Sequence, residues 1–177
     1  MQFETTHIKG LFIITPRIFG DSRGAFFEAF NQKVFSQNGI DISFVQDNQS
    51  VSSYGVIRGL HFQNAPYAQT KLVRVVIGKI LDVAVDIRKD SPTYGKYFSI
   101  ELSAENRKQL LIPHGFAHGF SVLSETAQVI YKCDNFYNKE SEGGIRYNDP
   151  QLSIDWQIPA GKEIVSEKDL LLRDLRG

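Results

Sequence analysis

The chain has 177 residues, with 20 Lys and Arg against 20 Asp and Glu, so its formal net charge is zero and its pI is near 6.9. This balance argues against a general nucleic-acid binder, which needs a basic face to displace counterions from phosphates. No run approaches the roughly 18–20 apolar residues of a membrane span and no signal-peptide pattern opens the chain, so we expect neither membrane contact nor export. Because Cys133 is the single cysteine, we also expect no internal disulfide and no Cys-based zinc site.

Short segments rich in β-branched and aromatic residues recur along the chain, separated by turn signals. In chain order we expect strands over 8–14, 26–30, 42–46, 50–54, 59–63, 71–77, 79–87, 98–102, 109–112, 118–122 and 126–136. One or two helical turns are expected within 31–39 and a short helix within 166–176. Strands of about 4–8 residues at this spacing are typical of an antiparallel sandwich or barrel. With no repeat, low-complexity tract or linker, residues 1–177 are expected to form one all-β cytoplasmic domain.

Two acidic residues interrupt the apolar run 79–87. Asp82 and Asp86 fall on the same face of this strand as Ala84, because alternate residues of a strand share a face. Carboxylates on an apolar face need cationic or amide partners, or water. Asp82 and Asp86 are therefore expected inside or at the rim of a polar site, or else at a solvent-facing strand edge.

The histidines provide the first chemical signal. His7 is expected to be structural or exposed, whereas residues 113–120 have the Pro-x-Gly-x-x-His form of the second cupin motif, which ends here on His118. A metal-binding cupin also needs a His-x-His motif with a following Glu, and the upstream candidate 58–63 holds only His61. Two histidines without a carboxylate or thiolate make a poor first-row metal site. We therefore expect the cupin frame without a catalytic metal.

A cavity that holds His61, Lys71, His118 and Tyr131 without a metal would support acid–base chemistry. One geometric question stays open at this point. Residues 58 and 61 would face opposite ways in an ideal strand, although Gly59 permits a bulge that re-aims one of them.

Taken one at a time, several of these residues have simpler interpretations. His61 alone would be a hydrogen-bonded core histidine, and Arg23 alone a solvated arginine in a turn. The run 46–48 alone would be an exposed turn. Only their joint pattern favours a functional site.

Together, eight segments in order resemble the dTDP-4-dehydrorhamnose 3,5-epimerase family. They are DSRGAFFE at 21–28, QDN at 46–48, RGLHFQ at 58–63, KLVRV at 71–75, DVAVDIR at 82–88, IPHGFAHGF at 112–120, YK at 131–132 and SEKD at 166–169. The match covers nearly the whole chain. It implies a cupin-type jelly roll, either barrel or sandwich, with a few short helices. Members of the family are usually homodimers and need no metal or organic cofactor.

The family's reaction inverts C3 and C5 of dTDP-4-dehydro-6-deoxy-D-glucose, which gives the precursor of dTDP-L-rhamnose for surface polysaccharides. The C4 ketone acidifies both C–H bonds because either carbanion delocalises as an enolate, so the reaction needs a base, an opposite-face acid and a donor to the enolate oxygen. By resemblance, His61 is the base and Tyr131 the acid. Asp169 orients the imidazole, and Lys71 lies near the C4 oxygen.

The resemblance also implies a set of substrate-binding residues. Arg23 and Arg58 suit the diphosphate through bidentate contacts, and Phe19 and Tyr137 are placed to stack on thymine. The remaining binding positions are Glu28, Gln46, Asn48, His118, Glu142 and Lys168. In this family some binding residues reach across the dimer interface.

Two alternative functions remain open from the sequence. A single 3- or 5-epimerase of a dTDP-4-keto-6-deoxyhexose, serving another deoxysugar pathway, keeps the same His, Asp and Tyr. A non-catalytic nucleotide-sugar-binding cupin would keep Arg23 and Arg58 but would not need His61, Tyr131 and Asp169 together. The favoured expectation is a cofactor-independent isomerase that inverts both carbons.

Overall fold

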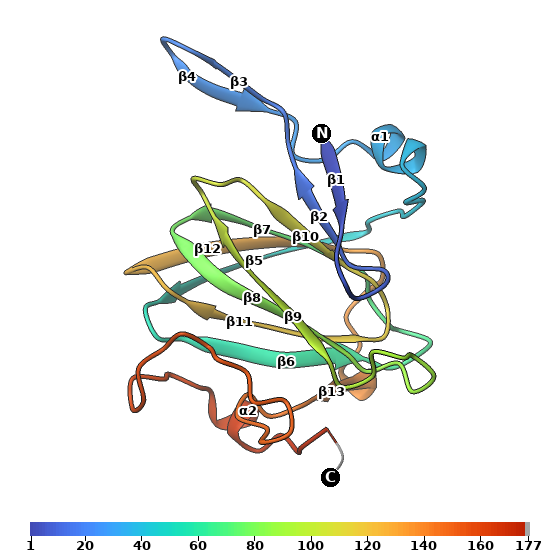
Figure 1. Cartoon of the computed structure of the whole chain (residues 1–177), viewed down its shortest axis with the longest axis vertical. Helices are drawn as coiled ribbons and strands as arrows, with labels where there is room; N and C mark the ends of the chain where they lie inside the picture. Colours follow the sequence, from blue (N-terminus) through green and yellow to red (C-terminus); the bar gives the residue numbers. More distant parts are fainter. Residues whose placement is uncertain (176–177) are drawn as a thin grey trace.

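Two antiparallel sheets face one another in the computed structural model, which describes residues 1–175 (Figure 1). The six-stranded sheet runs, in spatial order, β1 (Gln2–Thr5), β2 (Phe12–Thr15), β10 (Gln109–Ile112), β7 (Lys71–Ile77), β12 (Thr126–Cys133) and β5 (Gln46–Ser53). The five-stranded sheet runs β13 (Glu142–Gly144), β6 (Ile57–Gln63), β11 (Phe116–Val122), β8 (Lys79–Asp86) and β9 (Tyr97–Ser103). The expected all-β jelly-roll class is confirmed.

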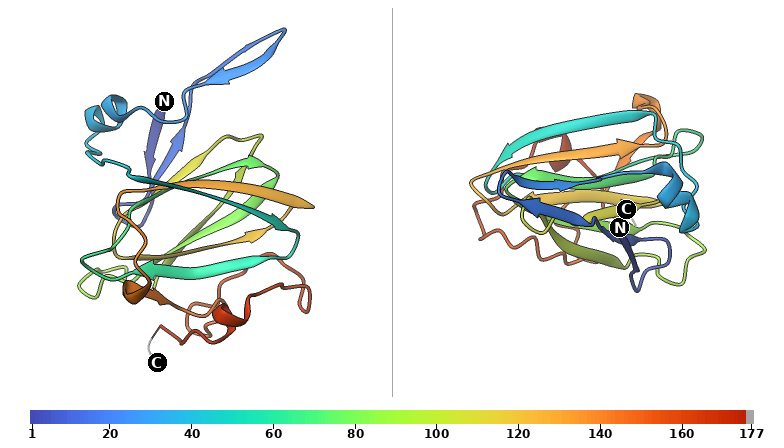
Figure 2. Two further views of the ribbon diagram at one scale, coloured as in Figure 1. Left: turned by 180° about the vertical axis from the view of Figure 1, so that it is seen from behind. Right: turned by 90° about the horizontal axis from the view of Figure 1, so that it is seen from above.

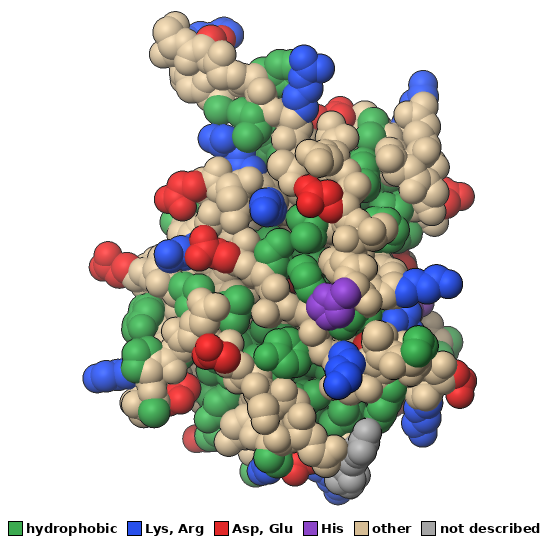
Figure 3. Space-filling model, viewed as in Figure 1, with side chains coloured by type: hydrophobic (Ala, Val, Ile, Leu, Met, Phe, Trp, Pro, Cys, Tyr) green, Lys and Arg blue, Asp and Glu red, His purple; other side chains and the backbone are tan. Residues whose placement is uncertain are grey.

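A two-stranded hairpin and a few short helical segments complete the fold. The hairpin, β3 (Ile18–Asp21) with β4 (Gly24–Phe27), projects away from the sheets (Figures 1 and 2). The helical segments are α1 (Gln32–Gln37), the 3-10 turn η1 (Lys139–Ser141) and α2 (Glu167–Leu170). Among residues 1–175, no helix has the length and apolar character needed to cross a bilayer. Positive and negative side chains are interspersed on the face shown in Figure 3, which accords with the zero net charge.

Strand predictions agree best with the structure where burial imposes the pattern. The expected strands 71–77 and 109–112 coincide with β7 and β10. The near-continuous apolar run became β8, because the facing sheet covers one side of this strand and the C-terminal segment, including Leu152 and Trp156, covers the other.

One expected strand is wrong and one expected helix is confirmed, and packing explains where each segment departs from its local preference. The expected strand 42–46 is irregular up to residue 45, because Ile42 and Phe44 pack with Phe35 of α1 instead of joining a sheet. The short helix expected within 166–176 is α2, which spans Glu167–Leu170. Beyond it the chain runs beside residues 145–146, where the Arg146 N–H donates to the Arg173 carbonyl at 3.0 Å. Residue 176 lies outside the described residues.

The acidic residues of β8 lie inside the protein, so the expectation of a solvent-facing edge is wrong. Asp86 is fully buried and accepts hydrogen bonds from Arg88 Nε at 2.8 Å, Ser91 Oγ at 2.6 Å and Thr93 Oγ1 at 2.6 Å. Burial alone would raise the pKa of Asp86, but these hydrogen bonds together lower it well below its usual range. The Asp86 carboxylate therefore stabilises the loop that connects β8 and β9. Asp82, also fully buried, contacts His118, which lines the cavity described next.

Candidate active site

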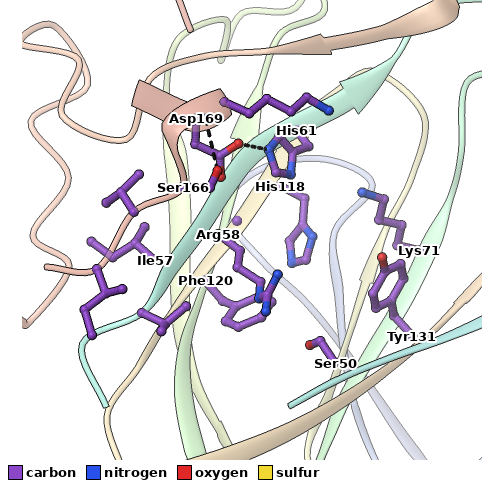
Figure 4. A pocket seen from close by; sticks show the side chains of 15 residues that line it. Ser50, Ile57, Arg58, His61, Lys71, His118, Phe120, Tyr131, Ser166 and Asp169 are labelled. Atoms are coloured by element: carbon purple, nitrogen blue, oxygen red, sulfur yellow. Dashed lines mark hydrogen bonds and ion pairs between the residues drawn. The ribbon is translucent and has the colours of Figure 1, made fainter. Parts of the chain in front are cut away.

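A cavity of about 480 Å³ opens between the two sheets (Figure 4). Its polar and aromatic lining comprises Arg58 and His61 from β6, His118 and Phe120 from β11, Lys71 from β7, Tyr131 from β12, and Ser166, Lys168 and Asp169 around α2. An adjoining cavity of about 290 Å³ shares His61, Lys71 and Tyr131 with the first. The two cavities therefore meet at the three residues that the sequence nominated for proton transfer and enolate stabilisation.

A bulge in β6 turns two functional side chains toward the same cavity. His61 pairs with His118 and Arg58 pairs with Phe120, so three steps along β6 match two steps along β11. The extra residue is accommodated at Gly59, whose φ is +115°. Both Arg58 and His61 line the cavity as a result, which confirms the bulge that Gly59 was expected to permit.

Substituting Gly59 by Ala is expected to destabilise the protein beyond the cost of backbone strain alone. An added Cβ would lie 2.6 Å from both Gly119 Cα and the His118 carbonyl oxygen. Overpacking typically costs about 1–3 kcal/mol and a positive φ costs a similar amount, so we expect a loss of about 2 kcal/mol or more. For a chain of this size each kcal/mol lowers Tm by about 2–4 °C, which calorimetry resolves.

Gly39 provides the matched control for this substitution. Its φ is +77°, and an added Cβ there would have no neighbour within 4 Å. Gly39→Ala should therefore show only the strain contribution. Equal losses of Tm in the two variants would contradict the close packing of β6 against β11.

His61 and Asp169 form a hydrogen-bonded pair at the cavity wall. His61 Nε2 lies 2.7 Å from Asp169 Oδ1, with 33% of the His61 side chain exposed and 6% of the Asp169 side chain. The Gly59 N–H donates to Asp169 Oδ2 at 3.3 Å, and the Asp169 N–H donates to Ser166 Oγ, the N-cap of α2. With Nε2 committed to the carboxylate, His61 Nδ1 remains as the proton acceptor of the neutral ring.

The Asp169 carboxylate is held in its ionised form. Burial raises the pKa of Asp169, but the hydrogen bond and charge of His61, together with the Gly59 N–H, outweigh burial and lower it. An ionised Asp169 fixes the His61 tautomer and stabilises the imidazolium that forms when His61 takes up a proton.

Lys71 and Tyr131 stand on the opposite sheet from His61 (Figure 4). Lys71 Nζ lies 5.7 Å from the centroid of the Tyr131 ring. Burial lowers the pKa of Lys71, although the nearby carboxylates of Asp82 and Glu142 act in the other direction. Burial also raises the pKa of Tyr131, which keeps its hydroxyl protonated and able to act as an acid. A histidine paired with a carboxylate and a protonated tyrosine therefore face the cavity from opposite walls.

A second His–Asp pair lies deeper in the five-stranded sheet. His118 Nε2 is 2.8 Å from Asp82 Oδ1, and both residues are buried. Asp82 was not nominated as a site residue, although its place on an apolar strand face had indicated a polar partner. Nearby, Arg58 Nε donates to Ser52 Oγ at 3.0 Å, which fixes the guanidinium at the cavity.

Four of the nominated binding residues line the adjoining cavity, namely Gln46, Asn48, Tyr137 and Glu142, and Lys168 bonds to one of them from the larger cavity. Lys168 Nζ donates to both carboxylate oxygens of Glu142 at 2.7 Å, and the Tyr137 hydroxyl donates to Glu142 Oε2 at 3.0 Å. The Tyr137 N–H donates to Gln46 Oε1 at 3.0 Å, and Gln46 Nε2 donates to Asn48 Oδ1 at 3.1 Å. Lys168 itself lines the larger cavity. This lobe is rich in hydrogen-bonding groups.

Three nominated binding residues lie away from both cavities of the same chain. Phe19 and Arg23 stand on the projecting hairpin, with Phe19 53% exposed and the Arg23 side chain 88% exposed. Arg23 Nη2 lies 2.6 Å from Asp21 Oδ2, within the hairpin. Glu28 follows the hairpin and accepts from Asn31 Nδ2 at 2.9 Å.

The cavity also contains residues that sequence reasoning did not nominate. Val56, Ile57, Ile164 and Val165 line one part of it. Ile164 and Val165 come from an irregular segment with no periodic pattern, so no sequence signal placed them at the site. Within residues 1–175, no group of three or more His, Cys, Asp or Glu side chains is arranged to hold a metal ion. The geometry suits proton transfer at opposite faces of a molecule held between the sheets.

Known proteins share both the sequence and the architecture of this chain. The family model described as dTDP-4-dehydrorhamnose 3,5-epimerase matches residues 5–176. A dTDP-4-dehydrorhamnose 3,5-epimerase of Shigella flexneri is 54% identical over 171 residues, which cover 96% of this chain and 93% of the relative. The crystal structure of such an epimerase from Elizabethkingia anophelis is 53% identical, with a TM-score of 0.95 over 99% of this chain and 97% of that one. A Legionella pneumophila 3,5-epimerase solved with dTDP-4-keto-L-rhamnose is 48% identical, with a TM-score of 0.94 over 99% and 93%.

Proposed function

The chain belongs to the dTDP-4-dehydrorhamnose 3,5-epimerase family, and from this membership we propose that its cleft inverts C3 and C5 of dTDP-4-dehydro-6-deoxy-D-glucose by proton transfer alone. The observation that carries the proposal is the placement of the His61–Asp169 pair on one sheet and Tyr131 on the other. A sugar ring between the sheets would present one face to the base and the opposite face to the acid.

Each inversion is a balanced pair of proton transfers. His61 Nδ1 takes the proton from C3 or C5, and the electron pair left on carbon delocalises onto the C4 oxygen as an enolate. The Lys71 ammonium stabilises this negative charge. The Tyr131 hydroxyl then protonates the same carbon from the opposite face, which inverts it. The imidazolium loses its proton to water and the tyrosinate regains one, so both residues return to their starting states before the second carbon reacts.

The hydrogen-bonding groups of the adjoining cavity support the binding of the nucleotide. Arg58 is placed for the diphosphate, and Tyr137 offers an aromatic face for thymine. Gln46, Asn48 and Glu142 carry amide and carboxylate groups that suit the edge of a base. His118 and Lys168 line the larger cavity and would contact the sugar and phosphates.

We place this binding and the reaction within one domain, residues 1–177, in the cytoplasm, where nucleotide sugars are made.

The protruding hairpin supports a homodimer whose two active sites are shared. Phe19, Phe26 and Arg23 are exposed on a two-stranded element that residues 1–175 leave largely uncovered. Placed over the cleft of a second subunit, the hairpin would supply Phe19 for thymine stacking and Arg23 for the diphosphate. Glu28, at the base of the hairpin, would accompany them.

Mixed dimers test this arrangement directly. Arg23→Ala and His61→Asn subunits are each expected to form weak or inactive homodimers, since loss of a charged hydrogen bond costs about 1.5–3 kcal/mol and loss of the base stops the reaction. Co-expressed, they should give hybrid dimers with one intact site and epimerisation well above either variant alone. Absence of any recovery in purified hybrid dimers would place Arg23 in its own subunit's site or outside the site.

Proton NMR of dTDP-4-dehydro-6-deoxyglucose with the enzyme in D₂O tests the proposed reaction. Deuterium at both C3 and C5, with the L-sugar trapped by a downstream reductase, is the expected result. Exchange at one carbon would instead identify a single epimerase of another deoxysugar pathway. Binding of dTDP without exchange at either carbon would identify a nucleotide-sugar-binding protein and overturn the proposal.

A further inference from the structure

One end of the larger cavity is apolar, in contrast to the rest of the cleft. It is formed by Val56, Ile57, Phe120, Ile164 and Val165, which we call the apolar end. In Figure 4 Ile57 lies on the left of the view, whereas Lys71 and Tyr131 lie on the right. Ile57 therefore lies apart from Lys71 and Tyr131 in this view, with Arg58 between them.

Main-chain hydrogen bonds join two distant segments at the apolar end. The Ile57 N–H donates to the Ile164 carbonyl at 2.9 Å, and the Ile164 N–H donates to the Gly55 carbonyl at 2.9 Å. Gly55 has a φ of +84°, and a Cβ there would lie 2.4 Å from the Lys162 carbonyl oxygen. Only glycine at this position lets the segment around Ile164 approach the start of β6. The close approach sets Ile164 beside Val56 at the cavity.

Ile164 is the most exposed member of the apolar end, whereas Ile57 is 1% exposed and packs into the core cluster of Leu152 and Trp156. Ile164 is 53% exposed although it lies beside Val56 in a cavity wall, whereas Phe120 behind them is almost fully buried. An apolar surface of this kind, surrounded by polar groups, is typical of a binding site for an apolar substituent.

We propose that the apolar end receives the C6 methyl group of the 6-deoxy sugar and so determines both the choice of substrate and the position of C5. The inference rests on the proposed function. The substrate carries hydroxyl groups, a ketone, a diphosphate and a nucleoside, for which the rest of the cleft supplies polar or aromatic partners. The methyl group is the only wholly apolar substituent of the hexose. It is attached to C5, one of the two carbons that react, so anchoring it would hold C5 between His61 and Tyr131.

This arrangement gives the two reacting carbons different sensitivities to the apolar end. C5 is bonded directly to the methyl group, whereas C3 is separated from it by C5 and C4. A polar group introduced at the apolar end should therefore disturb deprotonation at C5 more than deprotonation at C3.

The test introduces a hydroxyl at the apolar end and compares the two carbons within one experiment. Val56→Thr and Ile164→Thr each place a hydroxyl there, and Val56→Thr does so with little change of shape. We expect the rate of deuterium incorporation at C5 relative to C3 to fall about tenfold or more, the effect typical of a mismatched group in an apolar pocket. Ile77→Thr, at the end of β7 and 48% exposed, is the control and should leave the ratio unchanged.

The outcomes separate this inference from the proposed function. An unchanged C5-to-C3 ratio in both variants, or an equal fall at both carbons, overturns the assignment of the methyl group. Failure of the unmodified enzyme to exchange at either carbon overturns the proposed function itself.

A second substrate tests the same assignment without any substitution. The 6-hydroxy analogue, dTDP-4-dehydroglucose, should react with a kcat/KM about tenfold or more below that of the 6-deoxy sugar, and Val56→Thr should narrow the gap. Equal kcat/KM values for the two sugars with the unmodified enzyme would contradict the inference.

Discussion

Replacing His61 by Asn is expected to abolish deuterium exchange at both C3 and C5 while leaving dTDP affinity nearly unchanged. Asn preserves a hydrogen-bonding side chain beside Asp169 but has no basic nitrogen to take the proton. A positioned general base contributes about 10²–10⁴-fold, and because the same base serves both carbons in the proposed mechanism, both exchange rates should fall by at least this amount. Proton NMR in D₂O measures exchange, and calorimetric titration with dTDP measures binding.

His114 provides a matched control on the protein surface. Its Nε2 lies 2.9 Å from Asp134 Oδ2, so it forms the same kind of His–Asp pair, but its side chain is 51% exposed and it lines neither cavity. His114→Asn should therefore exchange both carbons at the normal rate. Near-normal turnover in His61→Asn would show that another group is the base.

Replacing Tyr131 by Phe is expected to separate exchange from inversion. The phenyl ring keeps the cavity wall beside Lys71 but has no hydroxyl to protonate the carbanion. His61 should still remove a proton and return a deuteron from solvent to the same face, so deuterium enters with retention of configuration. Inversion should fall about 10²–10⁴-fold, the usual contribution of a general acid. NMR distinguishes the two events because it reports both deuterium content and the configuration of each carbon.

Tyr94→Phe serves as the control for this second substitution. Tyr94 lies in the connection between β8 and β9 and lines neither cavity, so its hydroxyl should not affect either measurement. If Tyr131→Phe inverted both carbons at the normal rate, the acid would have to be another group. If it lost exchange as completely as inversion, Tyr131 would act in proton removal instead.

The strands were predictable from the sequence wherever burial in the fold accounts for the pattern of apolar residues. The pattern of apolar residues over 71–77 reflects packing between the sheets, and the near-continuous apolar run of β8 reflects burial on both faces. Residues 42–45 carry the same local preference, but packing of Ile42 and Phe44 against α1 removes them from the sheet. The tail after Leu170 has helical preference, but its main chain bonds to residues near 145. In both cases contacts between distant segments outweigh local propensity.

The site was only partly predictable, because its parts come from distant segments. His61 and Asp169 are 108 positions apart and meet through α2, whose N-cap at Ser166 aims the carboxylate. Gly59 permitted a bulge, but the pairing of β6 with β11 decides that both Arg58 and His61 face the cavity. No sequence pattern predicted that Ile164 lines the cavity. Main-chain hydrogen bonds to Gly55 and Ile57 place it there, and the close approach is possible because Gly55 has no side chain.

The placement of His61 and Tyr131, the proposed base and acid, on two different sheets has an evolutionary consequence. The distance between His61 and Tyr131 depends on side chains that never touch the substrate, such as Val73, Ala84 and Val129 in the core between the sheets. A core substitution that thickens or thins this layer changes the catalytic distance even when the protein remains stable. Natural selection on turnover therefore acts on the core as well as on the cavity. Among related enzymes, the sizes of facing core residues should covary so that the spacing of the sheets is preserved.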